Sequence, residues 1–203
     1  MYWYQIGQTL TAVEREPEEE QPGVVLLTSE ELTHQPKLAG LERVLCHTPP
    51  ARDARVCKAE VRSDCLSGTL VLPRQGKGGS RPACGYLVTE KRVVLVDDAD
   101  FILPLMKRLV KEKRPTEQSV GRFLYDFFEQ LIAKDLYKLE EIEDRAEQLE
   151  DQVLAHRLEE FSAPMTALRK ETMAWFRYYS QLDDVACELR ENENSFFTQE
   201  EEM

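Results

Sequence analysis

Residues 116–197 contain two apolar stripes with helical spacing, and they constrain the fold more than any other feature of the chain. Beyond Asp135 the first stripe advances in steps of three and four, and the second does so throughout. The first stripe is Leu124, Phe128, Leu131, Leu139, Ile142, Ala146, Leu149 and Val153, and the second is Leu168, Thr172, Trp175, Tyr179, Leu182, Ala186 and Leu189. Each stripe must be covered by the other or by a partner, so a long antiparallel helical hairpin is predicted.

The ends of these helices can be predicted from capping and breaking residues. Thr116 is the predicted N-cap of a first helix that runs unbroken to about His156, a length of roughly 60 Å. The second helix is expected to open near Leu158 and to end within residues 191–195. Thr198 and Glu201 have capping-box spacing, which predicts the start of a third helix and leads us to expect that the chain is cut from a longer protein.

Residues 1–115 have the pattern of a mixed α/β domain. Strands are predicted at 2–6 and 24–27, and Thr28 with Glu31 forms a capping box that predicts a helix from there to about Val44. Alternating apolar residues predict a strand from 56. A second strand is predicted over 66–72, and a hairpin of strands 85–89 and 92–96 is predicted across the polar turn at 90–91.

A further helix is predicted after the hairpin, capped by Asp97 or Asp98, with Pro104 in its first turn. The expected fold class is α+β or α/β. A mixed β-sheet with helices on both faces (αβα, 1–115) precedes the long acidic antiparallel hairpin, which leads into a truncated stalk helix (116–203).

Charge is distributed unevenly between the two parts. The chain has a net charge of −12, and residues 116–203 alone hold 22 Asp and Glu against 9 Lys and Arg. Such an acidic field repels nucleic acid and attracts cations. Nucleic acid is therefore not an expected partner.

The five cysteines and the N-terminus bear on location. An odd number of widely spaced cysteines without a Cys-x-x-Cys pair favours a reducing compartment. The first residues lack the pattern of a signal peptide, and the longest apolar runs are far shorter than the ~20 residues that cross a bilayer. We expect this chain to be soluble and cytosolic.

Three segments resemble the cytosolic part of CorA-type divalent-cation transporters. They are 121–154, 168–197 and the strand–helix run that starts at Val93. The resemblance implies a cytosolic domain of a homopentameric magnesium or other divalent-metal transporter, on the cytoplasmic side of the membrane. The membrane helices and the Gly-Met-Asn motif of that family would lie beyond Met203. For residues 1–203 alone we expect a monomer or weak oligomer, whose contact with the membrane comes only through the missing helices.

The resemblance also implies a regulatory metal site shared between subunits. The matching segment is 41–45, in which Glu42 is present but Arg43 stands where an acidic residue is expected. An arginine beside Glu42 would neutralise the cluster that a hard cation needs.

The long helices carry a second candidate for metal attraction. Carboxylates at steps of three and four share a helix face and could hold hydrated Mg²⁺ weakly. The candidate residues are Glu140, Glu143, Asp144 and Glu147. The alternative interpretation is an ordinary solvated helix face.

Other motifs have simpler explanations. Asp97, Asp98 and Asp100 lack the rest of an EF-hand loop, so they favour a helix cap. The run 76–80 breaks the spacing of a phosphate-binding loop. A zinc site is one interpretation of the candidate ligands Cys46, His47, Cys57 and Cys65, but their spacing fits no standard zinc module.

No catalytic constellation is evident. His34 and His156 stand alone, without a nearby nucleophile and acid, so the chain is not expected to be an enzyme or to hold an organic cofactor. The alternative to a transporter domain is a stand-alone coiled-coil adaptor whose apolar stripes bind a partner helix.

Overall fold

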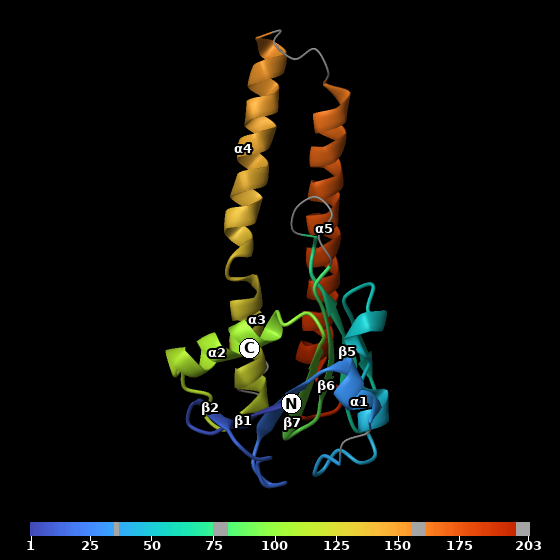
Figure 1. The fold of residues 1–203 in the computed structure, drawn as a ribbon, viewed down its shortest axis with the longest axis vertical. Coiled ribbons are helices and arrows are strands. Elements are labelled where there is room, and N and C mark those ends of the chain that lie inside the picture. Colours follow the sequence, from blue (N-terminus) through green and yellow to red (C-terminus); the bar gives the residue numbers. More distant parts are fainter. Residues whose placement is uncertain (35–36, 75–80, 156–160, 198–203) are drawn as a thin grey trace.

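The computed structural model describes residues 1–34, 37–74, 81–155 and 161–197, in which a seven-stranded sheet lies at one end of a long helical hairpin (Figure 1). The strand order is β2-β1-β3-β7-β6-β5-β4. The strands are β1 (Tyr2–Ile6), β2 (Leu10–Val13), β3 (Gly23–Leu27), β4 (Lys58–Val61), β5 (Leu66–Val71), β6 (Ala83–Val88) and β7 (Arg92–Asp97). Only β3 and β7 pair in parallel within this sheet, so the predicted mixed sheet is confirmed.

The sheet is covered on both faces, as its continuous apolar strands require. On one face, alternate residues such as Val24 and Leu95 pack with the helices α2 (Ile102–Glu112), α3 (Val120–Ile132) and α5 (Ser162–Glu191). On the other face, Val25 and Val94 pack with Leu38, Leu41 and their neighbours in the loops that follow β3. The αβα arrangement is therefore confirmed.

The first helix is much shorter than predicted. α1 spans Ser29–Thr33 and has the predicted capping box of Thr28 and Glu31, but it does not continue to Val44. Gly40 has a φ of +75°, which an α-helix cannot contain, and Pro36 in the sequence lacks the N–H that a continuing helix needs. Residues 37–53 contain turns and two short 3₁₀ helices, at Leu45–His47 and Ala51–Asp53.

A buried arginine fixes the acidic loop between β2 and β3. The Arg92 guanidinium at the start of β7 donates hydrogen bonds to the carbonyl oxygens of Pro17 (2.8 Å), Glu18 (2.7 Å) and Gln21. Burial lowers the pKa of Arg92 from its usual value. Because a buried polar group needs hydrogen-bond partners, the Arg92 guanidinium fixes the path of the β2–β3 loop through the carbonyl oxygens of its backbone.

Helix α2 (Ile102–Glu112) begins five residues after β7 ends at Asp97, and its N-cap position is Phe101, which makes no side-chain cap. The prediction of Asp97 or Asp98 as the N-cap is therefore wrong. The Asp97 carboxylate nevertheless accepts hydrogen bonds from the backbone N–H groups of Ala99 (2.8 Å) and of Ile102 (2.7 Å), the first residue of α2. Asp98 instead accepts two bonds from Ser29, at the start of α1. Pro104 lies in the first turn of α2, as predicted.

The predicted single helix from Thr116 to His156 is wrong in two respects. The N-cap is Ser119, whose Oγ accepts from the Arg122 N–H at 2.8 Å, whereas Thr116 is buried and donates to the carbonyl oxygen of Gly7. The helix is also divided into α3 (Val120–Ile132) and α4 (Asp135–Leu154), with residues 133–134 between them. α3 lies beside the sheet, and α4 forms one arm of the hairpin (Figure 1).

α4 and α5 (Ser162–Glu191) run antiparallel and project beyond the sheet, which confirms the predicted hairpin (Figure 1). Ile142 and Leu168 are buried between the helices, and Arg145 forms an ion pair with Glu171 at 2.6 Å. Near the sheet α5 is buried on a wider face than the predicted stripe, because Tyr178 and Val185 also pack into the core. In the described ranges, no helix has both the length and the apolar character needed to cross a bilayer.

Candidate functional site

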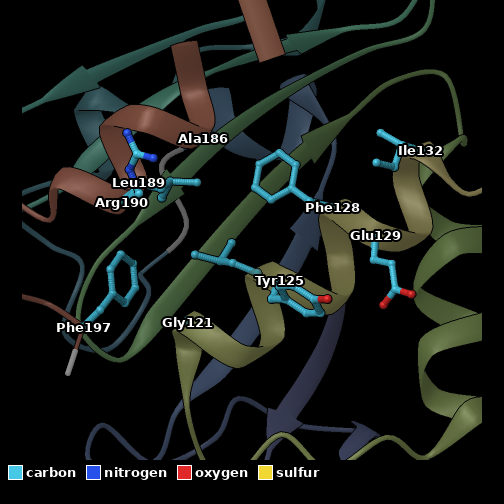
Figure 2. Close-up of a pocket in the computed structure, with 10 residues that line it drawn as sticks. Gly121, Tyr125, Phe128, Glu129, Ile132, Ala186, Leu189, Arg190 and Phe197 are labelled. Carbon is cyan, nitrogen blue, oxygen red and sulfur yellow. The ribbon is translucent and has the colours of Figure 1, made fainter. Parts of the chain in front are cut away.

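An apolar groove of about 440 Å³ lies between α3 and the C-terminal end of α5. Figure 2 shows Tyr125 and Phe128 of α3 on one wall, with Leu189 and Phe197 on the other. The lining residues are Gly121, Leu124, Tyr125, Phe128, Glu129, Ile132, Ala186, Leu189, Arg190 and Phe197. Because most of this lining is hydrocarbon, the groove can bind an apolar surface.

The groove exists because α3 has more apolar residues than one face can bury. Phe123 and Phe127 point into the core and are each 1% exposed. On the outer face, Tyr125 is 57% exposed and Ile132 is 37% exposed. The exposed apolar surface continues across the helix break to Leu136, which is 64% exposed. The outer face of α3 therefore lacks a partner among the described residues.

The far wall is shaped by the end of α5. Asn192 has a left-handed backbone (φ 48°) and ends the helix. Its side chain accepts from the Phe197 N–H at 3.1 Å and donates to the Phe197 carbonyl oxygen at 2.9 Å. The Asn194 amide also donates to the carbonyl oxygen of Arg62, at the β4–β5 turn. These bonds hold Phe197 on the groove wall.

The two charged groups of the groove have different environments. Glu129 forms an ion pair with Arg114, which also pairs with Glu112 at 2.9 Å. Arg190 forms no ion pair with a carboxylate in the part of the chain described. A bound apolar segment would therefore find one cation at the edge that can accept a carboxylate or carbonyl partner.

The predicted metal-attracting residues of α4 lie on its solvent side. Glu140, Glu143, Asp144 and Glu147 are all exposed, and none forms an ion pair within the described ranges. Their helix position matches the prediction, but their role in attracting Mg²⁺ stays a prediction. A loosely held hydrated cation would need only their summed field.

Glu42 is exposed and lines a second cavity, of about 590 Å³, together with residues 89–92 at the β6–β7 turn and with none of the four α4 carboxylates. Three cations, Arg43, Lys91 and Arg92, line the same cavity and offset its carboxylates. Across the described residues no group of three or more His, Cys, Asp or Glu side chains is placed to hold a metal ion.

The remaining sequence candidates are mostly scattered. Cys57 and Cys65 are buried, as expected for small strand-flanking residues, whereas Cys46 is exposed. Two aromatic residues of α5 differ sharply in exposure: Phe176 is 67% exposed, whereas Tyr178 is buried in the core. The Gly-rich run 76–80, His156 and the Thr198–Glu201 capping box lie outside the described residues.

One buried polar pair was missed by sequence reasoning. Asp135 is only 9% exposed and accepts a hydrogen bond from the Tyr179 hydroxyl at 3.2 Å. Burial raises the pKa of Asp135 to about 6, and the bond from Tyr179 partly opposes that shift. The available signal was an acidic residue four positions from both Leu131 and Leu139, on the apolar stripe.

No protein-family model and no curated protein matches this sequence, but solved structures share its fold. The soluble domain of CorA from Methanocaldococcus jannaschii matches with a TM-score of 0.76 and 18% identity, over 100% of this chain and 84% of that one. The complete CorA magnesium transporter of the same organism matches with a TM-score of 0.74 and 16% identity, over 99% of this chain. The cytoplasmic domain of ZntB from Vibrio parahaemolyticus matches with a TM-score of 0.65 and 17% identity, over 97% of this chain and 81% of that one.

These likenesses define the class of fold. The chain has the fold of a CorA-type soluble domain: a mixed sheet flanked by helices, followed by long helices. It spans 66% of the length of the complete CorA chain. At these identities the comparison describes the fold alone, and the activity of the longer proteins is a matter for proposal.

Proposed function

We propose that this chain is the cytosolic regulatory and assembly domain of a CorA-like divalent metal-ion transporter, with Mg²⁺ as the expected ion. The observation that carries the proposal is the likeness to the soluble domain of CorA over the whole length of this chain. The acidic character of residues 116–203 supports it, because a field of that sign concentrates divalent cations near the hairpin.

In this proposal divalent cations act weakly and between subunits. Carboxylates such as Glu140 and Glu143 of neighbouring copies would repel each other, and hydrated Mg²⁺ would offset that repulsion. Loss of the cation would then favour a splayed assembly, a shift between two states with different cation affinity. The working form is a homo-oligomer at the cytoplasmic side of a membrane.

The apolar groove has a place in the same proposal. Phe197 is fixed on the groove wall, so a segment that continues from it leaves directly beside the exposed face of α3. The complete CorA chain is half as long again as the part matched here. We propose that a following helix of a longer chain covers this groove and joins the domain to membrane helices.

The deciding experiment is to read the source transcript past the codon for Met203 and to assay the full product for uptake of Mg²⁺ into cells. Two apolar runs of about 20 residues, together with uptake that depends on the protein, would support the proposal. A stop codon directly after Met203, or a membrane protein that moves no divalent ion, would overturn it. If a stop codon follows Met203, a coiled-coil adaptor becomes the better interpretation, because the groove would then be free to bind the helix of another protein.

A further inference from the structure

Asp135 occupies a position in the apolar stripe that a hydrocarbon side chain would ordinarily fill. It stands four residues after Leu131 and four before Leu139, and its side chain is buried with theirs. It is also the first residue of α4, which begins without a side-chain cap. A carboxylate at such a place conflicts with the local pattern, and conflicts of this kind mark functional or strained positions.

The partners of Asp135 come from one aromatic cluster on α5. Tyr179 donates to Asp135 Oδ2 at 3.2 Å, and its ring stacks on Trp175 with centroids 6.2 Å apart. Tyr178 contacts both rings edge-on, at 5.9 and 5.3 Å. The Tyr178 hydroxyl is buried and has no hydrogen-bond partner in the described part of the chain. The cluster therefore gives the Asp135 carboxylate one hydrogen-bond donor, the Tyr179 hydroxyl. It also contains the Tyr178 hydroxyl, which has no partner in the described part of the chain.

No cation compensates the charge of Asp135. From α5 the titratable groups that face it are Tyr178 and Tyr179, and Tyr178 in turn interacts with Cys57, beside β4. On its own segment, Lys134 is exposed, and Lys138 pairs with Glu141 at 2.7 Å. Within the described ranges no Lys, Arg or His forms an ion pair with Asp135. Apart from the N-terminal dipole of α4, the ionised form is therefore stabilised by one phenol.

The helix break beside Asp135 is a natural hinge. α3 is anchored in the sheet domain by Phe123 and Phe127, whereas α4 is held to α5 mainly along a single stripe. Residues 133–134 separate the two helices, and Lys134 has φ −104° and ψ −4°, away from ideal helical values. Because α5 is anchored to the sheet by Tyr178 and Val185, a change in the first turn of α4 can alter how α4 packs on α5 without disturbing α3.

We propose that Asp135 and Tyr179 form a proton-operated latch at the α3–α4 junction, closed when Asp135 is neutral and loosened when it is ionised. A neutral carboxylic acid suits the buried stripe position, and it gains an O–H donor in a cluster that contains an unsatisfied hydroxyl. The ionised form is better solvated by water than by a single phenol, so water enters or the first turn of α4 separates from α5. The proton is exchanged with solvent.

This latch goes beyond the proposed transporter role and needs no metal. The test uses the whole chain in buffer with EDTA and a Trp3→Phe background, in which Trp175 is the only tryptophan. The ¹³C chemical shift of the Asp135 carboxyl and the Trp175 emission are followed from pH 4.5 to pH 8. Both are expected to change with a common midpoint near 6, the pKa to which burial raises Asp135.

The control variants separate the latch from a general effect of pH. Asp135→Asn should abolish the Trp175 transition and keep the emission of the low-pH form, whereas Asp151→Asn, at an exposed site on the same helix, should leave the transition intact. A Trp175 transition that persists in Asp135→Asn would overturn the proposal. So would an Asp135 carboxyl that titrates entirely below pH 5 in the Trp3→Phe protein.

A second variant keeps the test valid if Asp135→Asn fails to fold. Tyr179→Phe removes the donor that stabilises the carboxylate, so the midpoint of Asp135 should move to higher pH. An unchanged midpoint would overturn the role of Tyr179 in the latch. Because every measurement is made without divalent ions, failure here would leave the transporter proposal untouched, and failure of transport would leave the latch untouched.

Discussion

The backbone N–H of Cys57 donates a hydrogen bond to Gln181 Oε1 at 3.0 Å, across 124 positions of sequence. Cys57 directly precedes the edge strand β4, and Gln181 lies on α5, so this bond joins the helical hairpin to the outer edge of the sheet. The sulfur of Cys57 in turn accepts from the Val71 N–H at 3.2 Å, within the same edge. The side-chain amide of Gln181 therefore helps to join the helical hairpin to the edge of the sheet.

Replacement of Gln181 by Leu should reduce the free energy of unfolding by about 1–3 kcal/mol, because the buried Cys57 N–H would lose its acceptor. Urea denaturation monitored by circular dichroism measures this change. Gln152→Leu, the same substitution at an exposed position of α4, is the control and should change stability by less than about 0.5 kcal/mol. Equal effects of the two substitutions would show that the Cys57–Gln181 bond contributes nothing specific.

Gly85→Ala should prevent stable folding or cost more than about 3 kcal/mol, the upper range for overpacking. A Cβ at this position would lie 1.8 Å from the carbonyl oxygen of Pro49, whose loop crosses directly over β6. Gly7→Ala is the matched control, because its Cβ would meet nothing closer than 3.6 Å. Thermal melts of both variants test the difference, and a Gly85→Ala protein as stable as the Gly7→Ala protein would contradict the packing described here.

The stability of the chain should contain a pH-dependent contribution from Asp135. Its pKa is about 6 in the folded state against 3.8 as an isolated group, so the folded state binds the proton more tightly. This contribution is present below pH 3.8 and is lost as pH rises through 6. At about 1.4 kcal/mol per pKa unit, Asp135→Asn should be more stable than the wild type by about 3 kcal/mol at pH 7.5 and by little at pH 4. Denaturant titrations at the two pH values measure it, and a stability difference independent of pH would contradict it.

Mg²⁺ should raise the melting temperature of the chain more than Na⁺ at matched ionic strength, if the α4 carboxylates attract it as proposed. Changing Glu140, Glu143, Asp144 and Glu147 to their amides should remove most of this difference, because the field they create is removed. A control with four amides at the exposed residues Glu14, Asp53, Asp100 and Glu117 has the same net charge and should keep it. If Mg²⁺ and Na⁺ act alike on the wild type, this part of the chain has no specific response to the cation.

Residues 1–203 alone should be a monomer or weak oligomer at micromolar concentration. The groove beside Phe197 is covered by no described residue, and in the proposed longer chain much of the contact between subunits would lie beyond this segment. Sedimentation velocity measures the state directly. A stable pentamer would mean that the sheet domain and hairpin carry enough contact surface by themselves.

Sequence periodicity predicted those elements that are governed by one repeating pattern. The stripe through Ile142 and the stripe through Leu168 predicted the hairpin, because one face decides the burial of each helix, and the apolar runs predicted six of the strands. The predicted length of α1 was too great because a capping box marks only where a helix starts. The left-handed backbone of Gly40, which a continuing helix could not contain, depends on the loop around it. Strand β2 has only one buried residue, Leu10, and too little pattern to predict.

The candidate sites were harder to predict for a physical reason. Tyr178 and Val185 of α5 are buried because this helix packs on both α4 and the sheet. A single apolar stripe predicts contact with one neighbour only, so it does not predict the burial of these two residues. The groove depends on the distance between α3 and the end of α5, which no local pattern specifies. Asp135 could have been found, since an acid at a stripe position is visible in the sequence, but its partner Tyr179 lies 44 residues away.

The contacts of Arg92 have a consequence for how this protein can vary. Its guanidinium holds the loop before β3 by the carbonyl oxygens of Pro17, Glu18 and Gln21, and every amino acid supplies such an oxygen. The side chains of Glu18, Glu19 and Glu20 are exposed and form none of these three hydrogen bonds. Glu18 and Glu20 can therefore be replaced without loss of these hydrogen bonds, whereas Glu16 and Glu19 also stabilise the buried guanidinium by their charge. The sequence of this loop can diverge while its path stays the same, as long as acidic residues remain near Arg92.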